Sequence, residues 1–191
     1  MGQSRILAIS LLAVLVLLLG MGAVACGGNG DETAPSGGAE MELISVAFQE
    51  GGTIPTEHTC DGLDISPALS WSGAPEGTQS FALILDDPDA PGGAFTHWVI
   101  FNIPADTLEL EAAIPVTPQL ANGAQQGEND FGTIGYRGPC PPSGASHHYH
   151  FAVYALDITL ELTAGATKAQ LLNAMQGHIL AQGGLVAVCQ R

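Results

Sequence analysis

The sequence predicts a mainly β domain built from two packed sheets. Short apolar runs bounded by Gly, Pro and Asp recur along the chain, and their content of Val, Ile, Phe and Tyr favours strands over helices. Only one segment has the apolar spacing of a helix, and it lies close to the C-terminus. Many strands, one late helix and many turn-rich loops together indicate a sandwich of sheets.

Four apolar runs are the clearest strand candidates. In the last of them a period of two places Tyr149 and Phe151 on one face and His150 and Tyr154 on the other. Because both faces are largely apolar, we expect this strand to lie inside a sheet that is covered on both sides. The four runs are residues 43–48, 80–85, 97–103 and 149–156.

The predicted helix begins at Thr167, whose hydroxyl can cap it, and runs to Met175 or as far as Leu180. Its leucines and Met175 fall close to one stripe, as expected for a helix with one buried side. Gly183 and Gly184 follow and are expected to end it.

The first 25 residues are predicted to be a targeting segment. Arg5 is the only charge before an apolar run over residues 6–19, and Ala23-Val24-Ala25 stand directly before Cys26. This arrangement resembles the lipobox of bacterial lipoproteins, in which the cysteine is acylated and the chain is cut before it. The apolar run is short for a membrane span of about 20 residues, which favours cleavage. An ordinary secretory signal with a chance cysteine, or an uncleaved anchor, would export the domain too.

Three regions follow from this interpretation. Residues 1–25 are a lipoprotein signal peptide, residues 26–40 are the lipidated Cys26 with a flexible tether, and residues 41–191 are one domain. The tether is Gly-rich and polar, with nothing apolar enough to build a core. The remaining chain is long enough for a substantial core. We expect an exported domain, lipid-anchored on the outer face of the bacterial cytoplasmic membrane or in the periplasm.

The charge of the chain excludes some partners. All 19 acidic residues follow Cys26, whereas only three of the four basic residues do, so the mature chain carries a net charge of 3 − 19 = −16. Nucleic-acid binding needs clustered Lys and Arg, which this chain lacks. Adhesion to anionic lipid is equally disfavoured, apart from the lipid anchor itself.

Three cysteines remain once Cys26 is acylated: Cys60, Cys140 and Cys189. An odd number in an oxidising compartment indicates one disulfide and one free thiol. Cys60 and Cys140 both lie in loops rich in Gly, Pro and Asp, whereas Cys189 ends an apolar segment. Cys60–Cys140 is therefore the pair to test first. No C-x-x-C spacing is present, so nothing indicates a zinc ribbon or a thioredoxin-like centre.

The first segment with chemical character is residues 86–91, where three aspartates and two prolines precede His97. Proline fixes φ, so this loop leaves its carboxylates few directions in which to point. Carboxylates this close raise one another's pKa values, so one of them can hold a proton and donate a hydrogen bond. His97 follows Asp87 closely enough to return to the same end of the sheet. The plainer interpretation is a solvated acidic turn.

The second segment, residues 138–144, is a stiff Pro-rich loop that leads to His147, His148 and Tyr149. Alternation places His147 and Tyr149 on one face of the following strand. A Zn²⁺ site from His97, His147, Tyr149 and a carboxylate is compatible with the residue types, but no metal-ligand spacing supports it. No Gly-x-Ser-x-Gly turn marks a nucleophile, and Asp130-Phe131-Gly132 is interpreted as a chance match to a kinase tripeptide.

These residues also carry a family resemblance. The chain resembles the phosphatidylethanolamine-binding proteins, also called Raf kinase inhibitor proteins, and specifically their bacterial branch. The match covers nearly the whole mature domain, with two family signatures in the right order and at the right separation. The matching segments are Cys60-Asp61-Gly62, residues 66–71, Asp87-Pro88-Asp89-Ala90-Pro91, His97-Trp98, Asn102-Ile103-Pro104, Asn129-Asp130-Phe131-Gly132, residues 138–142 and residues 147–151.

The resemblance implies a large antiparallel sheet packed on a smaller one, one or two short helices near the C-terminus, and a shallow anion-binding pocket at one end. Proteins of this family bind phosphate-like groups there, including phospholipid headgroups and phosphotyrosine-like anions, without a cofactor. At the C-terminus this chain has Cys189 in a segment where relatives often have Gly-x-Tyr-x-Arg, which puts the closing strand in question. Carried over by position, the pocket residues are Asp87, His97, His147 and Tyr149, walled by Pro139, Pro141 and Pro142.

Three functional hypotheses follow. The first is an extracytoplasmic binding protein for a small phosphorylated or otherwise anionic ligand, acting as an inhibitor or modulator of a kinase, a protease or another protein. The second is a hydrolase that uses His97 or His147 as a general base oriented by Asp87. The third is an inhibitor whose contact surface lies on loops outside the pocket. The absence of a nucleophile or metal signature favours binding over catalysis.

Overall fold

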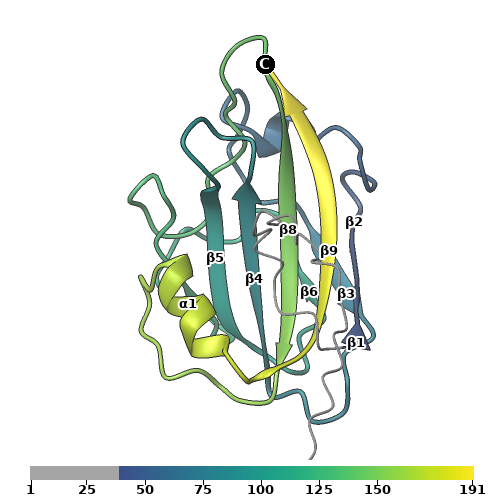
Figure 1. Ribbon diagram of the computed structural model, residues 1–191, viewed down its shortest axis with the longest axis vertical. Helices are drawn as coiled ribbons and strands as arrows, with labels where there is room; N and C mark the ends of the chain where they lie inside the picture. The colour runs from purple at the N-terminus through teal and green to yellow at the C-terminus, as the bar shows by residue number, and fades with distance from the viewer. Residues whose placement is uncertain (1–38) are drawn as a thin grey trace, which may run out of the picture. The chain divides into compact units, whose positions relative to one another are not determined.

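The computed structural model describes residues 39–191, and most of the ordered elements are strands (Figure 1). The predicted signal peptide, Cys26 and nearly all of the predicted tether lie outside the described residues. The elements are β1 (Ala39–Glu40), β2 (Glu42–Ser45), the 3-10 helix η1 (Thr56–His58), β3 (Leu69–Ser72), β4 (Ser80–Asp87), β5 (Phe95–Pro104), β6 (Glu109–Leu110), β7 (Gln125–Gln126), β8 (Ser146–Leu156), α1 (Lys168–Met175) and β9 (Ile179–Gln190).

Two sheets of unequal size form the framework. The larger has six strands in the order β1-β9-β8-β4-β5-β7, and the smaller has three in the order β2-β3-β6. Neighbouring strands are antiparallel, except that β1 pairs with β9 in parallel. The predicted fold class, a large antiparallel sheet packed on a smaller one with a short helix near the C-terminus, is confirmed.

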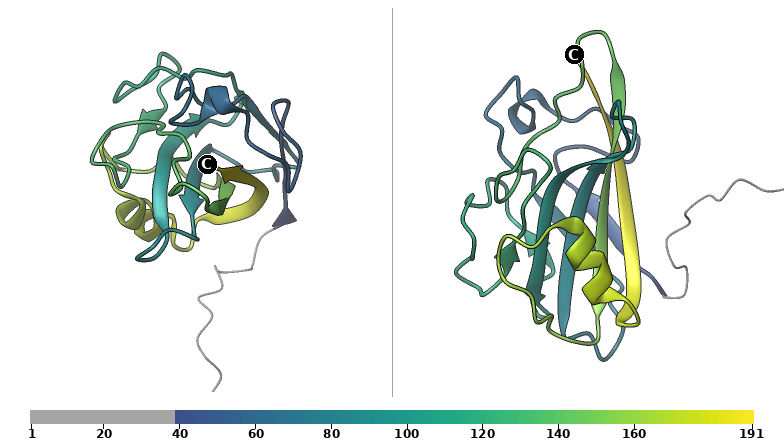
Figure 2. Two further views of the ribbon diagram at one scale, coloured as in Figure 1. Left: turned by 90° about the horizontal axis from the view of Figure 1, so that it is seen from above. Right: turned by 60° about the vertical axis from the view of Figure 1, so that its left-hand side comes forward.

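The large sheet is buried on both faces where β4 crosses its centre. Phe81, Leu83 and Leu85 point toward the small sheet, and Ala82 and Ile84 point the other way. The second face is covered by α1, which lies on the side of the large sheet away from the small one (Figure 2). Strands buried on both faces have near-continuous apolar sequences, which explains why β4 is almost uniformly apolar.

Strand β8 corrects one expectation. Its central position in the sheet is as predicted, but its burial alternates over the first half, where the side chains on one face are exposed. His148 and His150 lie on this exposed face because α1 covers only the other end of the sheet. The strand also begins three residues earlier than the apolar run predicts, at Ser146, so that His147 is part of it.

The first of the two predicted helix ends, Met175, is confirmed, and the extension to Leu180 was wrong. The capping box at Thr167 and Gln170 forms, but α1 ends at Met175, and Gln176 and Gly177 turn the chain, the latter with φ +80°. Ile179 and Leu180 begin β9, since two adjacent apolar residues fit a strand as well as a helix. No helix in residues 39–191 is long and apolar enough to span a membrane.

The two glycines expected to end the helix lie inside β9 instead. At Gly183 an added Cβ would come within 2.5 Å of the Met41 carbonyl oxygen, so the close approach of the N-terminal segment requires glycine there. The closing strand is well formed: Cys189 stands opposite His147 in the β8–β9 ladder and its thiol is free and buried.

Candidate functional site

Four polar side chains assigned to one pocket from the sequence come together at one end of the large sheet. Asp87 is the last residue of β4, and His97 lies near the start of β5. His147 and Tyr149 lie near the start of β8. Because β4 runs antiparallel between β5 and β8, the end of β4 and the starts of β5 and β8 meet at the same end of the sheet. All four residues are at most 7% exposed, so the cluster is built into the end of the core.

Asp87 and His147 form a buried hydrogen-bonded pair. The Nδ1–H of His147 donates to Oδ2 of Asp87 at 2.8 Å, and Oδ1 of the same carboxylate accepts the backbone N–H of Asp89 at 2.9 Å. A carboxylate only accepts, so Nδ1 of His147 carries the proton. Nε2 is then an acceptor in the neutral ring and becomes a second donor only when the ring is protonated.

His97 is fixed in the same way by a different partner. Its Nδ1–H donates to the backbone carbonyl of Arg137 at 2.8 Å, and its ring meets Tyr149 edge to face at 5.3 Å between centroids. Burial lowers the pKa of His97, an effect that the Arg137 carbonyl and the Asp87 carboxylate oppose only in part. The ring is therefore neutral at pH 7, with Nε2 as an acceptor.

Tyr149 supplies the donor that lacks a partner. Its side chain is fully buried, and its hydroxyl makes no hydrogen bond within residues 39–191. Burial raises the pKa of this phenol far above its ordinary value, and the neighbouring Asp87 carboxylate raises it further, so the proton stays on. The carboxylate lies beside the hydroxyl without reaching hydrogen-bond geometry. A buried hydroxyl of this kind normally has an acceptor, so it marks the side on which a ligand would bind.

The Pro-rich loop of residues 138–142, here called the wall, lies next to the Tyr149 side chain. Pro139 and Pro141 are buried, whereas Pro142 is exposed and its carbonyl accepts the Ala145 N–H in the turn that leads to β8. The backbone amide of Cys140, between the first two prolines, opposes in part the rise in the pKa of the Tyr149 hydroxyl.

The wall is held from behind by residues 56–64, here called the buttress loop. Tyr136 Oη donates to the His58 carbonyl at 2.6 Å, and Asp64 Oδ1 accepts the Gly138 N–H at 2.6 Å. Cys60 is bonded to Cys140, the pair put first in the sequence analysis, with the two Cα atoms 5.4 Å apart. The buttress loop therefore fixes the wall at several successive residues.

Replacing Gly138 by alanine is expected to destabilise the wall. A Cβ there would overlap the His58 carbonyl oxygen and come within 2.9 Å of the Thr59 Cα, both backbone atoms that cannot rotate away. Overpacking of this kind costs about 1–3 kcal/mol, measurable as a lower urea midpoint. Gly184→Ala is the control, because its nearest neighbour is the Phe151 carbonyl oxygen at 3.8 Å. Equal midpoints for the two variants would contradict the tight contact between wall and buttress loop.

The Asp-Phe-Gly segment, expected as part of the family match and not as a kinase tripeptide, also lies against this site. Phe131 is 42% exposed and packs edge to face on His97, with the Arg137 guanidinium 5.7 Å from its ring centroid. Asp130 pairs with Thr96 at the start of β5 in both directions, through its side chain and its backbone N–H. Asp and Gly flanking an aromatic residue are typical of a turn, which is the signal that could have identified it.

A second Asp–His pair joins the same two segments on the other face of the sheet. Asp89 Oδ2 accepts the His148 backbone N–H at 2.8 Å and the His148 Nδ1–H at 2.7 Å, and both bonds lower the pKa of Asp89. Together with Asp87 and His147, this exposed pair clamps the loop after β4 to the start of β8. The prolines of that loop thus act with two hydrogen-bonded Asp–His pairs, one buried and one exposed.

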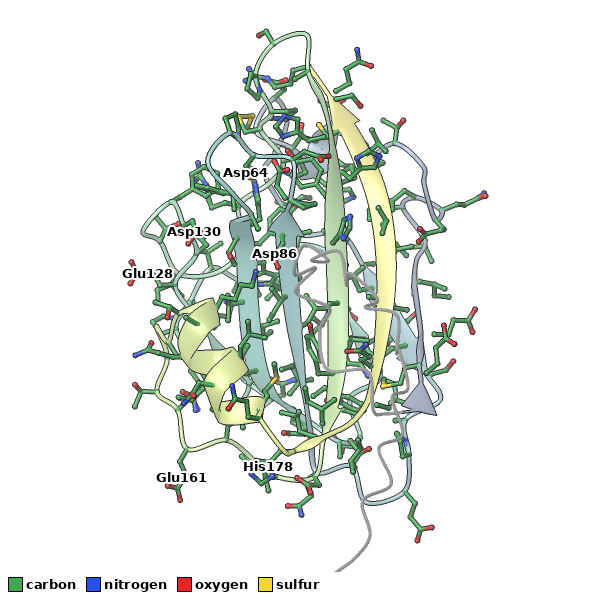
Figure 3. All side chains as sticks on the ribbon, viewed as in Figure 1. Asp64, Asp86, Glu128, Asp130, Glu161 and His178 are labelled. Atoms are coloured by element: carbon green, nitrogen blue, oxygen red, sulfur yellow. A yellow bond between two sulfur atoms is a disulfide. The ribbon has the colours of Figure 1, made fainter. Side chains whose placement is uncertain are left out.

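The surroundings supply no cationic side chain to the pocket. Each Lys or Arg in the described part of the chain is paired with an aspartate, at 2.7–3.3 Å: Arg137 with Asp64, Lys168 with Asp86 and Arg191 with Asp61. Figure 3 shows Asp64 and Asp86 on the ribbon near this end of the sheet. Within residues 39–191 no three His, Cys, Asp or Glu side chains are grouped so that they could hold a metal ion. The Tyr149 hydroxyl is thus the donor on offer at pH 7, and a histidine ring adds one only when it is protonated.

A surface groove lies elsewhere on the domain, away from Asp87, His97, His147 and Tyr149. It is a groove of about 730 Å³ between β2 and β9, lined by apolar residues such as Leu43 and Phe48 and by the acidic Glu40, Glu42 and Glu50. An anion would be repelled from this groove by its three carboxylates. The Asp87–His147 end of the sheet is the chemically better candidate for an anion.

The comparisons with known proteins agree on one family. The sequence model described as phosphatidylethanolamine-binding protein matches residues 44–190. A UPF0098 protein of Methanothermobacter thermautotrophicus is 53% identical over 151 residues, covering 79% of this chain and 99% of the relative. A protein of Mycobacterium tuberculosis named "Putative lipoprotein LppC" is 35% identical, covering 91% and 92%.

A solved structure agrees with these sequence matches. E. coli YbcL, described as a new member of the mammalian PEBP family, superposes with a TM-score of 0.73 at 36% identity and covers 80% of this chain and 99% of its own. The match includes both the two-sheet framework and the motif-bearing strands, since it spans nearly the whole described domain. The chain therefore belongs to the phosphatidylethanolamine-binding protein family, as a bacterial-type member.

Proposed function

We propose that the protein is an exported binding protein whose pocket of Asp87, His97, His147 and Tyr149 receives a small phosphate-like anion, and that ligand binding modulates a partner protein. The observation that carries this proposal is the buried Tyr149 hydroxyl, which has no partner among residues 39–191 and whose ring packs edge to face on His97. Buried hydroxyls and imidazoles converging on one point are typical of a site for an oxyanion.

Export through a lipid anchor is part of the proposal. The residues before Cys26 resemble a lipobox, and a relative that covers 91% of this chain carries the name of a lipoprotein. The Cys60–Cys140 disulfide supports an oxidising compartment. We propose that the domain works on the outer face of the cytoplasmic membrane or in the periplasm, with a net negative surface that keeps nucleic acids away.

Titration with inorganic phosphate and with phosphorylethanolamine tests the pocket directly. Both ligands are expected to shift the imidazole NMR signals of His97 and His147. The His178 signal serves as internal control, because His178 pairs with Asp157 at the opposite end of β9 (Figure 3). If the His97 and His147 signals stay in place at millimolar ligand, at about pH 6 and at about pH 7.5, the pocket assignment is wrong.

Anion binding is expected to tighten as the pH falls. Burial lowers the pKa of His97, so at pH 7 its ring is neutral and its free nitrogen cannot donate. A bound anion favours the protonated ring and raises this pKa again, so binding takes up a proton. As the pH falls from about 6.5, the ordinary histidine pKa, to the lowered pKa of free His97, the affinity for the anion increases by up to about tenfold per pH unit.

Sulfate is the probe for this pH dependence, because its own charge is constant in that range. Its dissociation constant should be measured by calorimetry at several pH values between about 5 and 8. His97→Gln is the control, since it keeps a donor at this position without a titrating group. A sulfate affinity that does not vary with pH in the unmodified protein would show that His97 takes no proton on binding.

Hydrolysis is the second candidate function, and one observation favours it. The Asp87–His147 pair leaves Nε2 of His147 unprotonated in the neutral ring, which is the arrangement of a general base oriented by a carboxylate. A water molecule would have to be the nucleophile. Turnover of a phosphoester panel that is lost in His147→Ala and kept in His178→Ala would promote this function over binding alone.

A further inference from the structure

Two strand edges that are open over part of their length line the groove between β2 and β9 (Figure 1). β2 is the outermost strand of the small sheet, and the outer neighbour of β9 is the two-residue strand β1. Within residues 39–191, β2 and β9 form no ladder with each other, although both line the same groove. Open strand edges present main-chain donors and acceptors, with which a further extended segment can pair.

On β9 the open position is Gly184. Alternate residues of a strand direct their N–H and C=O groups to the same edge. The Gln182 carbonyl accepts the Met41 N–H at 2.8 Å, and the Val186 carbonyl accepts the Gly51 N–H at 2.8 Å, so this edge is covered on either side of Gly184. Gly184 lies between these two residues, is exposed and lines the groove. Its N–H and C=O therefore point to the same edge, where no strand of the described domain pairs with them.

On β2 the open position is Leu43. The Trp71 N–H donates toward β6, to the Leu108 carbonyl at 2.9 Å, so the residues on either side of Trp71 bond to β2 instead. Their partners in β2 are Glu42 and Ile44. Leu43 lies between these two partners and therefore directs its N–H and C=O away from β3, to the open edge.

The groove is acidic, and exposed apolar side chains lie beside it. Glu40, Glu42 and Glu50, here called the groove glutamates, are all exposed, and the lining residues include no Lys, Arg or His. Ile44 is 48% exposed, and Val46, two residues further on, is 89% exposed. A segment that complements this surface carries basic side chains together with apolar ones.

Other occupants fit the charge of the groove less well. A second copy of the chain would bring the groove glutamates of two molecules together, and the strong net negative charge opposes such an association. The predicted tether over residues 27–38 carries Asp31 and Glu32 but no Lys or Arg. Anionic lipid headgroups would be repelled.

We propose that this groove is a docking site for a short extended segment of a partner protein that carries Lys or Arg. The main chain of the segment pairs with the open edges at Leu43 and Gly184, and its basic side chains pair with the groove glutamates. Main-chain pairing gives affinity for an extended segment, whereas the carboxylates select a basic one. The groove is separate from the proposed anion pocket, so this inference does not depend on anion binding.

A synthetic peptide of alternating Lys and Val, blocked at both ends, is the probe, and a Glu–Val peptide of equal length is its counterpart. Calorimetry with the full chain is expected to show binding of the Lys–Val peptide alone. An exposed ion pair changes affinity by up to about fivefold, so replacing all three groove glutamates with glutamine should raise the dissociation constant by about tenfold or more.

The matched control replaces three exposed glutamates outside the groove, Glu76, Glu111 and Glu161, with glutamine. Both triple variants then have the same net charge, and the control should bind the Lys–Val peptide as the unmodified chain does. Equal losses in the two variants would show that the peptide responds only to net charge, and this would overturn the proposal. Failure of the peptide to bind at millimolar concentration would overturn it too.

NMR tests the main-chain pairing. Saturation with the Lys–Val peptide is expected to shift the amide proton signals of Leu43 and Gly184 downfield and to slow their exchange with solvent. Unchanged amides would overturn the pairing. Protection of both amides without peptide would show that a second copy or the tether fills the groove, and this would also overturn the proposal. Sedimentation, together with a chain lacking residues 27–38, distinguishes these two occupants.

Discussion

Replacing His147 with alanine is expected to abolish anion binding and to lower the free energy of unfolding by about 3–5 kcal/mol. The ring is 8% exposed in its side chain and lies 2.8 Å from an Asp87 carboxylate that is 5% exposed. Removing it leaves a buried carboxylate with the Asp89 N–H as its remaining hydrogen-bond donor. An uncompensated buried charge is costly, since burial leaves it little contact with water.

The matched control for this prediction is His178→Ala. His178 also donates through Nδ1 to an aspartate, Asp157, at 2.8 Å, but the two side chains are 40% and 44% exposed. An exposed pair contributes less than about 1 kcal/mol, so the two variants differ chiefly in burial. Urea unfolding at about pH 7 gives the comparison. Losses of equal size in the two variants would mean that the Asp87–His147 pair does not act as a buried charge pair.

A double variant separates the charge effect from lost packing. Asp87→Ala combined with His147→Ala removes both members, so no buried charge is left unpaired. If the charge effect dominates, the double variant should be more stable than the sum of the two single losses predicts. Simple additivity would instead assign the cost of His147→Ala to packing.

The framework and the four candidate site residues could be predicted because their signals are local. Apolar runs between turn residues gave the central strands, and the period of two put His147 and Tyr149 on one face of β8. The sequence could not show that β4 lies between β5 and β8, which brings Asp87 to both histidines. Pairing of strands far apart in the sequence depends on tertiary packing, and local patterns do not record it.

The sequence also could not predict the direction of the pKa shift of His97. The partner of His97 is the backbone carbonyl of Arg137, forty residues further on, and the burial that lowers its pKa comes from Tyr149 and Phe131 around it. A histidine beside aspartates suggests a raised pKa, whereas the structure gives the opposite direction. Desolvation outweighs the nearby carboxylate because the ring is 3% exposed.

The loop that carries Phe131 to His97 should depend on one residue, Asn129. This side chain is buried and makes four hydrogen bonds: Nδ2 donates to the Gly135 carbonyl at 2.8 Å, and Oδ1 accepts the Phe131 N–H at 3.0 Å and the Thr133 N–H and hydroxyl at 3.2 and 3.0 Å. Asn129→Ala removes all four at once. With each bond worth about 0.5–1.5 kcal/mol net, and some groups able to turn to water, we expect a loss of roughly 2–4 kcal/mol.

The same variant should change the chemistry of His97. Without its support the turn loosens and Phe131 moves from the His97 ring, so the ring gains solvent and its pKa rises toward the ordinary value of 6.5. NMR titration of the His97 signal measures this rise. Asn122→Ala is the control, because that side chain accepts one bond, from the Ala124 N–H at 3.1 Å, in an exposed turn. A loss of stability in Asn129→Ala with an unchanged His97 pKa would show that the turn is structural only. A loss of stability together with a rise in the His97 pKa would mean that this turn keeps the pKa of His97 below its ordinary value, which makes anion binding by the folded pocket dependent on proton uptake.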